Sequence, residues 1–237
     1  MRHIVKGLEP DELSKWKEQN AGVPQNLRYS SLHGNVTRAI RQQMLTEQGY
    51  LCAYTMQRIG NVDDCHLEHI VPQSQPPESH QRDLDYKNML ACFPGNQLDP
   101  DKPTRDWNPR NPYGAKHKDK AEINAHNFIS PLSDDVERRF HFDASGFVNS
   151  DAGDTAAASS IRILNLDHGL LNDLRRAAID ERLFGSPLSA DDAEKLAVSI
   201  ATPDLAGLLP EFCVAISQAS IWYANVVRQN SGPDASA

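Results

Sequence analysis

The sequence predicts an α+β protein in which a short β-rich segment separates an N-terminal helical part from a mainly helical C-terminal part. Apolar residues recur every fourth position between residues 35 and 48, as expected of a helix with one buried face. Runs at 50–56 and 65–71, rich in apolar and aromatic residues, are typical of short strands. Beyond residue 154 the pattern becomes helical again.

The N-terminal elements have clear sequence signals. Pro10 and the acidic residues after it suit the first turn of a helix over 10–17. The second helix carries Val36, Ile40 and Met44 on one face, and Gly49 is a natural end for it. We expect 50–56 and 65–71 to pair as a hairpin, followed by a loop over 73–79, which holds two prolines.

The second half of the chain begins with an irregular connection. Residues 93–112 are dense in Pro, Asn and Asp, and a charged helix is expected over 115–125. A second hairpin is expected to join 140–142 to 146–148. The later helices are predicted from Asp154 onward: Asp167-His168 suits a helix cap or junction, 174–183 continues toward Gly185, Ser189 begins a capping box with Asp192, and 211–227 forms the last helix.

Length and composition limit the class of protein. The 237 residues suffice for one substantial core, or for a small catalytic module with helical additions. We divide them into an N-terminal helical segment (1–48), a central module (49–125), a mainly helical region (126–229) and a disordered tail (230–237). With 39% hydrophobic and 24% charged residues, no signal-like apolar start and no stretch of the roughly 20 residues that a membrane span needs, a cytoplasmic protein is expected.

The net charge and the cysteine content limit the class of protein further. A net charge of −8 argues against a protein that coats nucleic acid, although a local positive surface would still suffice for a nuclease. Without a secretion signal, disulfides are not expected. Cys52 is followed three positions later by Thr55, so the paired C-x-x-C pattern of a zinc knuckle is missing. We therefore expect buried cysteines rather than structural zinc at Cys52, Cys65, Cys92 and Cys213.

The adjacent pair Glu68-His69 carries the strongest chemical signal. Both residues lie near the end of the strand predicted over 65–71, and Pro72 stops further pairing. A carboxylate is a hard ligand for a divalent cation, and a neutral imidazole can take a proton from water. Strand alternation places His66 on the same face as Glu68 and His69 on the other, so the backbone must turn at Glu68 or His69 for the pair to act together.

Glu68-His69-Ile70, with Asn88-Met89-Leu90 about twenty positions later, resembles the HNH nucleases. Their ββα-metal motif opens with an acidic residue and His and continues through an Asn. The chain further resembles the HNH subunits that accompany an ATPase in Septu-type and retron-linked anti-phage defence systems (PtuB-like proteins). Short matching pieces cover most of the chain, at 1–6, 51–55, 84–92, 113–115, 129–132 and 164–168. The resemblance implies a ββα-metal HNH nuclease core over 49–125.

The resemblance also implies roles for individual residues. Glu68 would bind Mg²⁺, for which Mn²⁺ could substitute, and His69 would be the general base. Asn88 would hold the imidazole through a hydrogen bond. A third metal ligand is expected from a following helix, where His117 and Asn96 are the alternatives, and His66 is a further candidate ligand. Because His69 must be neutral to act, activity should fall at acidic pH.

The implied function is hydrolysis of DNA phosphodiester bonds by the effector nuclease of a defence complex with an ATPase (PtuA-like) partner and, in retron-linked systems, retron components. Two alternatives stay open: a nuclease-derived scaffold with little catalysis, and a stand-alone restriction-type or RNA-cleaving enzyme. A positive surface for nucleic acid could come from Arg38, Arg41, Lys116, Lys118 and Lys120. For each of these residues, ordinary solvated charge is the alternative.

Overall fold

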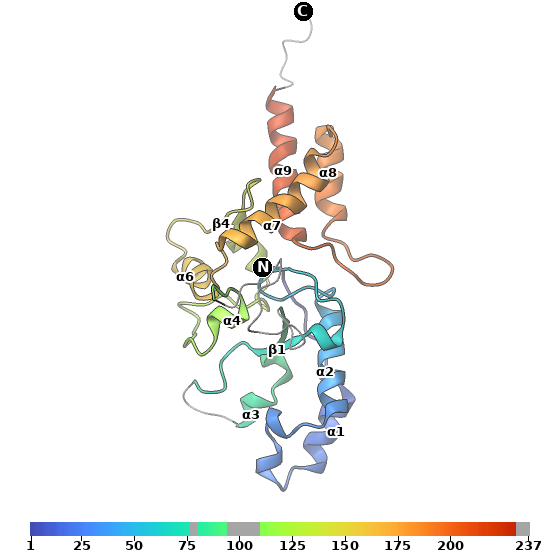
Figure 1. Cartoon of the computed structure of the whole chain (residues 1–237), viewed down its shortest axis with the longest axis vertical. Helices are drawn as coiled ribbons and strands as arrows, with labels where there is room; N and C mark the ends of the chain where they lie inside the picture. Colours follow the sequence, from blue (N-terminus) through green and yellow to red (C-terminus); the bar gives the residue numbers. More distant parts are fainter. Residues whose placement is uncertain (76–79, 94–109, 231–237) are drawn as a thin grey trace, which may run out of the picture.

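The computed structural model describes residues 1–75, 80–93 and 110–230, and over these residues the chain is an α+β protein. The body is elongated, with α1 and α2 at one end, β1 in the middle and α7, α8 and α9 at the other end (Figure 1). In chain order the elements are α1 (Asp11–Gln19), the 3-10 turns η1 (Pro24–Asn26) and η2 (Tyr29–Ser31), α2 (Gly34–Glu47), η3 (Val62–Asp64), β1 (His66–His69), α3 (His80–Asp83), η4 (Tyr86–Asn88), β2 (Met89–Cys92), α4 (Ala115–Lys118), α5 (Val136–Arg139), β3 (His141–Phe142), β4 (Val148–Asn149), α6 (Thr155–Leu164), α7 (Gly169–Ile179), the π-helical turn η5 (Asp180–Phe184), α8 (Ala190–Ser199) and α9 (Cys213–Asn230).

The predictions for α1 and α2 are confirmed. Val36, Ile40 and Met44 are all buried along one face of α2. Gly49 follows the helix with a φ of +59°, and a Cβ there would come within 2.5 Å of the Leu209 side chain. Glycine is therefore required at this position both by the left-handed backbone and by the close approach of the C-terminal region.

The prediction that 50–56 pairs with 65–71 is wrong. Strand β1 pairs antiparallel with β2 instead, with Glu68 opposite Leu90 and His69 opposite Met89. Tyr50 and Met56 have positive φ values, so the segment between them folds into turns and makes only one isolated bridge, Leu51 to Arg58. A strand needs a continuous extended backbone, which these two residues interrupt.

The helix predicted over 115–125 is much shorter than expected. Helix α4 ends at Lys118, because Asp119 adopts a left-handed φ of 41° with a ψ of −112°. The Lys118 side chain is directed into the interior, where it is 1% exposed. The charged helix expected over 115–125 is thus reduced to about one turn, and one of its lysines is buried. Most of the irregular connection predicted over 93–112 lies outside the described residues.

The C-terminal half follows the predictions closely. Strands β3 and β4 form the expected antiparallel hairpin, with Phe142 opposite Val148. His168 caps α7, accepting a hydrogen bond from the Leu170 amide at 3.1 Å, and the Ser189 hydroxyl caps α8. Of the tail predicted over 230–237, Asn230 is the last residue of α9, and 231–237 lie outside the described residues.

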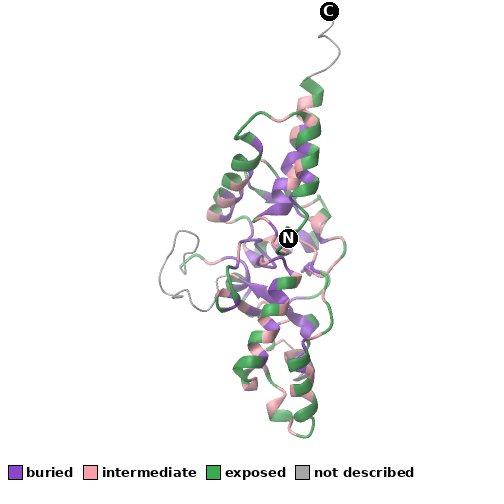
Figure 2. Ribbon diagram, turned by 90° about the vertical axis from the view of Figure 1, so that its right-hand side faces the viewer, coloured by how far each residue is buried: buried purple, intermediate pink, exposed green. Residues whose placement is uncertain are grey.

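The main apolar core runs through the middle of the molecule. It combines residues from α2, β1, β2, α6 and α9, and the buried segments concentrate between the two helical ends (Figure 2). The prediction that the four cysteines are buried is confirmed. In the part of the chain that the structure describes, every helix is too short or too polar to cross a membrane.

Candidate functional site

The sequence motif lies beside a small hollow at the end of β1. The hollow has a volume of about 280 Å³. Its lining includes side chains from β1, from the turn that follows β1 and from the residues just after α4: His66, Glu68, His69, Gln73, Asp119 and Lys120. The structure thus brings the Glu68-His69 pair together with two residues that lie some fifty positions later in the chain.

The His69 imidazole is held by Asp83 and Tyr29. Its Nε2 lies 2.9 Å from the backbone carbonyl oxygen of Asp83 and 3.7 Å from the carboxylate of the same residue. The Tyr29 ring packs edge-on against the imidazole with 5.8 Å between ring centroids, and the Tyr29 amide donates to the Asp83 carboxylate at 3.1 Å. Gln73 donates to the other oxygen of that carboxylate. Asp83 therefore contacts the imidazole directly and also holds Tyr29, whose ring packs against it.

Asn88 holds the backbone beyond His69 rather than the imidazole itself. Its Oδ1 accepts from the Val71 amide at 2.8 Å, and its Nδ2 donates to the Val71 carbonyl at 3.1 Å and to the Arg82 carbonyl at 3.4 Å. The Asn88 carbonyl also accepts from the Ile70 amide. The prediction that Asn88 bonds the imidazole is therefore wrong, because Asp83 fills that place. Asn88 fixes the turn at which β1 ends.

Glu68 is a buried carboxylate with a buried cationic partner. Its Oε1 accepts a hydrogen bond from Lys118 Nζ at 2.5 Å, and the Lys118 side chain is 0% exposed. The same ammonium donates to the His69 carbonyl at 3.0 Å. Lys118 was predicted to contact nucleic acid, and its burial contradicts that role. Burying a charge requires a charged partner, which explains why Lys118 turns inward toward Glu68.

The second oxygen of Glu68 lies near His66. Glu68 Oε2 is 3.6 Å from His66 Nε2, so the two side chains share one face of β1, as strand alternation predicts. Asp119 lines the same hollow. Among the described residues, however, no three His, Cys, Asp or Glu side chains are grouped closely enough to hold a metal ion.

Of the two alternatives for a third metal ligand, His117 is not among the residues that line this hollow. His117 is exposed, whereas Lys118 is buried, and the His117 Nδ1 is hydrogen-bonded to the Ile163 carbonyl at 2.8 Å. This contact directs the imidazole toward α6, so the prediction that His117 joins Glu68 is wrong for this arrangement. Asn96 lies outside the described residues.

The basic residues predicted to contact nucleic acid differ in their exposure and in the residues beside them. Lys116 and Lys120 are exposed, and Lys120 borders the hollow. Arg38 is exposed but lies 3.4 Å from Asp63. Arg41 is half-buried and lies close to the Tyr29 side chain, which packs against His69. Of the five predicted cations, Lys120 alone lines the hollow at Glu68 and His69.

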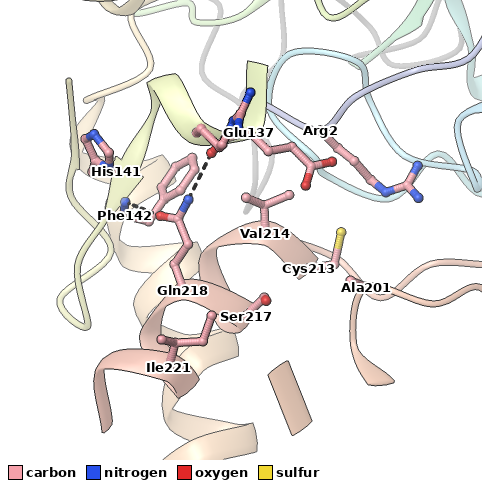
Figure 3. A pocket seen from close by; sticks show the side chains of 11 residues that line it. Arg2, Glu137, His141, Phe142, Ala201, Cys213, Val214, Ser217, Gln218 and Ile221 are labelled. Carbon is pink, nitrogen blue, oxygen red and sulfur yellow. Dashed lines mark hydrogen bonds between the residues drawn. The ribbon is translucent and has the colours of Figure 1, made fainter. Parts of the chain in front are cut away.

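A second hollow, of about 610 Å³, lies between the β3 segment and α9 (Figure 3). Gln218 crosses it, donating to the Glu137 and Phe140 carbonyls and accepting from the Phe142 amide. Burial raises the pKa of the Cys213 thiol to about 11, so this group is protonated at neutral pH and is a poor nucleophile. The hollow therefore has the character of a packing gap rather than of a catalytic site.

Sequence reasoning missed Asp83, Tyr29 and the inward role of Lys118. Asp83 lies five residues before Asn88, and its acidic side chain was the only sign of a role in the sequence. Nothing in the sequence pointed to Tyr29, which reaches His69 through tertiary packing alone. The chain matches no family model and no curated protein.

Proposed function

We propose that this protein is an HNH-type endonuclease that hydrolyses phosphodiester bonds with His69 as the general base. The observation that carries the proposal is the 2.9 Å contact between His69 Nε2 and the Asp83 carbonyl. A carbonyl only accepts hydrogen bonds, so in the neutral ring Nε2 carries the proton and Nδ1 carries the lone pair. Among the described residues none hydrogen-bonds Nδ1. The free lone pair supports a role in accepting a proton.

In this mechanism His69 Nδ1 takes a proton from a water molecule, whose oxygen bonds to phosphorus while the bond between phosphorus and the leaving 3′ oxygen breaks. The leaving oxygen takes a proton from solvent water. Asp83 and Tyr29 keep the imidazole in one orientation, and Asn88 fixes the backbone on which it stands. The exposed ammonium of Lys120 is available to contact the negatively charged phosphate. In the described arrangement Glu68 does not fit a divalent cation, because Lys118 already neutralises its charge.

The resemblance to PtuB-like proteins extends the proposal to a DNA substrate and to an ATPase partner in an anti-phage complex. A second candidate function is a nuclease-derived scaffold that binds such a partner without cutting. The contact between Lys118 and Glu68 favours this alternative, since it leaves the acidic residue of the motif without free charge.

The test is cleavage of supercoiled plasmid by the purified chain, with and without its co-expressed genomic neighbour, in Mg²⁺ or EDTA. His69→Ala should lower the rate at least about 100-fold, the usual contribution of a general base. His126→Ala is the matched control, because His126 is exposed and remote in sequence from the motif. Equal rates for His69→Ala and wild type would refute the assignment. Absence of cleavage, with His69→Ala still protecting cells from phage, would establish the scaffold.

A further inference from the structure

We propose that Gln73 is a second catalytic residue of this site, and that its side-chain oxygen holds the water molecule that attacks phosphorus. The inference deepens the proposed function and rests on it for the role of His69 as the general base. It begins from the position of Gln73, an exposed residue in the turn after β1 that lines the same hollow as His69.

The contact between Gln73 and Asp83 fixes the orientation of the Gln73 amide. Gln73 Nε2 donates a hydrogen bond to Asp83 Oδ1, and an ionised carboxylate accepts hydrogen bonds but cannot donate them, so the nitrogen rather than the oxygen faces Asp83. The backbone amide of Tyr29 holds the other oxygen of this carboxylate at 3.1 Å. Among the described residues none donates to Gln73 Oε1, which is therefore left as an acceptor.

The same carboxylate places the Gln73 amide beside the proposed base. His69 Nε2 lies 3.7 Å from Asp83 Oδ1, the oxygen that also accepts from Gln73. The imidazole and the amide thus meet at one atom, and both residues line the hollow. In the described part of the chain, His69 Nδ1 and Gln73 Oε1 are two acceptors without a donor.

Two neighbouring acceptors match the two protons of one water molecule. In the attack, one proton passes to His69 Nδ1 and the other is donated to Gln73 Oε1 and stays on the water oxygen. That oxygen bonds to phosphorus as the bond to the 3′ oxygen breaks, and the leaving oxygen takes a proton from solvent water. A hydrogen bond that fixes the attacking water lowers the entropic cost of the transition state, and glutamine orients the water nucleophile in GTP-hydrolysing enzymes in the same way.

Gln73→Met tests this role, because Met has nearly the same length and lacks both the amide oxygen and the amide nitrogen. In the plasmid assay kcat should fall at least about tenfold while KM stays the same, since the lost contact acts on the attacking water and not on bound DNA. Gln229→Met is the matched control. Gln229 is exposed in the last turn of α9, an element at one end of the molecule (Figure 1), so this variant should cleave at the wild-type rate.

Methanol separates this role from a structural one. Methanol has a single exchangeable proton, which His69 takes, so its attack gains nothing from Gln73 Oε1. In a buffer that contains methanol, mass spectrometry of the cleaved ends measures the ratio of 5′-methyl phosphate to 5′-phosphate. This ratio should rise in Gln73→Met by the factor by which hydrolysis falls, whereas a displaced His69 would slow both attacks equally.

The outcomes distinguish this inference from the function on which it rests. An unchanged product ratio in Gln73→Met, whether or not the rate falls, would overturn the role of Gln73 and leave cleavage that still depends on His69. Absence of cleavage by the wild type in every condition would refute the nuclease function and the role of Gln73 with it.

Discussion

Removal of the Asn88 side chain should destabilise the fold and disorder the end of β1. Asn88 is 7% exposed, and its amide makes two good hydrogen bonds to Val71, at 2.8 and 3.1 Å, and a longer one to Arg82 at 3.4 Å. At about 1 kcal/mol for each good bond, plus the cost of leaving half-buried backbone groups without partners, Asn88→Ala should lower the free energy of unfolding by about 2–3 kcal/mol.

For a chain of this length, that loss corresponds to a fall in Tm of roughly 4–12 °C. Urea denaturation and thermal melting measure it, and plasmid cleavage well below Tm separates the effect on His69 from the effect on stability. Asn35→Ala is the matched control, because Asn35 is exposed in the first turn of α2. A change of less than about 0.5 kcal/mol in Asn88→Ala would show that the turn does not depend on this amide.

Two further predictions concern the region around α6 and α7. Gly146→Ala should lower the free energy of unfolding by at least about 3 kcal/mol, because φ is +84° and the new Cβ would lie 2.2 Å from the Asn172 carbonyl oxygen. Gly153→Ala, with φ +95° and open space around the new Cβ, should lower it by only about 1 kcal/mol. Similar urea midpoints for the two variants would contradict the packing argument. The Arg139 guanidinium beside Asp154 lowers the pKa of that carboxyl from 3.8. The carboxylate therefore stabilises the fold above pH 3.8, and this stabilisation is lost as the pH falls through the lowered pKa. The difference in unfolding free energy between wild type and Asp154→Asn should shrink below about pH 4, and a constant difference down to about pH 2 would refute the linkage.

The helices could be predicted because their signals are local. Val36, Ile40 and Met44 repeat at helical spacing, and Ser189 and His168 cap helices through amides two or three residues away. Such patterns depend on neighbouring residues alone, and the structure follows them within a few positions.

The strand pairing could not be predicted in the same way. Residues 50–56 have the composition of a strand, but Tyr50 and Met56 have a left-handed backbone. The turns of this segment are held by contacts with distant residues: the Met56 carbonyl accepts from the amide of Phe212, just before α9, and the Ala53 amide donates to the Ala91 carbonyl in β2. Tertiary packing thus overrides the local preference. Glu68 and His69 lie at the end of a strand, as predicted, whereas Asp83 and Lys118, which contact them, come from segments whose approach no local pattern encodes.

The alternation of side chains along β1 separates the two chemical groups of the motif. Glu68 faces Lys118 on one side of the strand, and His69 faces Tyr29 on the other. Lys118 connects the two sides, since its ammonium binds the Glu68 side chain and the His69 carbonyl at once. Any change that withdraws this ammonium releases the carboxylate and removes a backbone contact of the proposed base in the same step. The charge state of Glu68 and the placement of His69 are therefore coupled through one buried lysine.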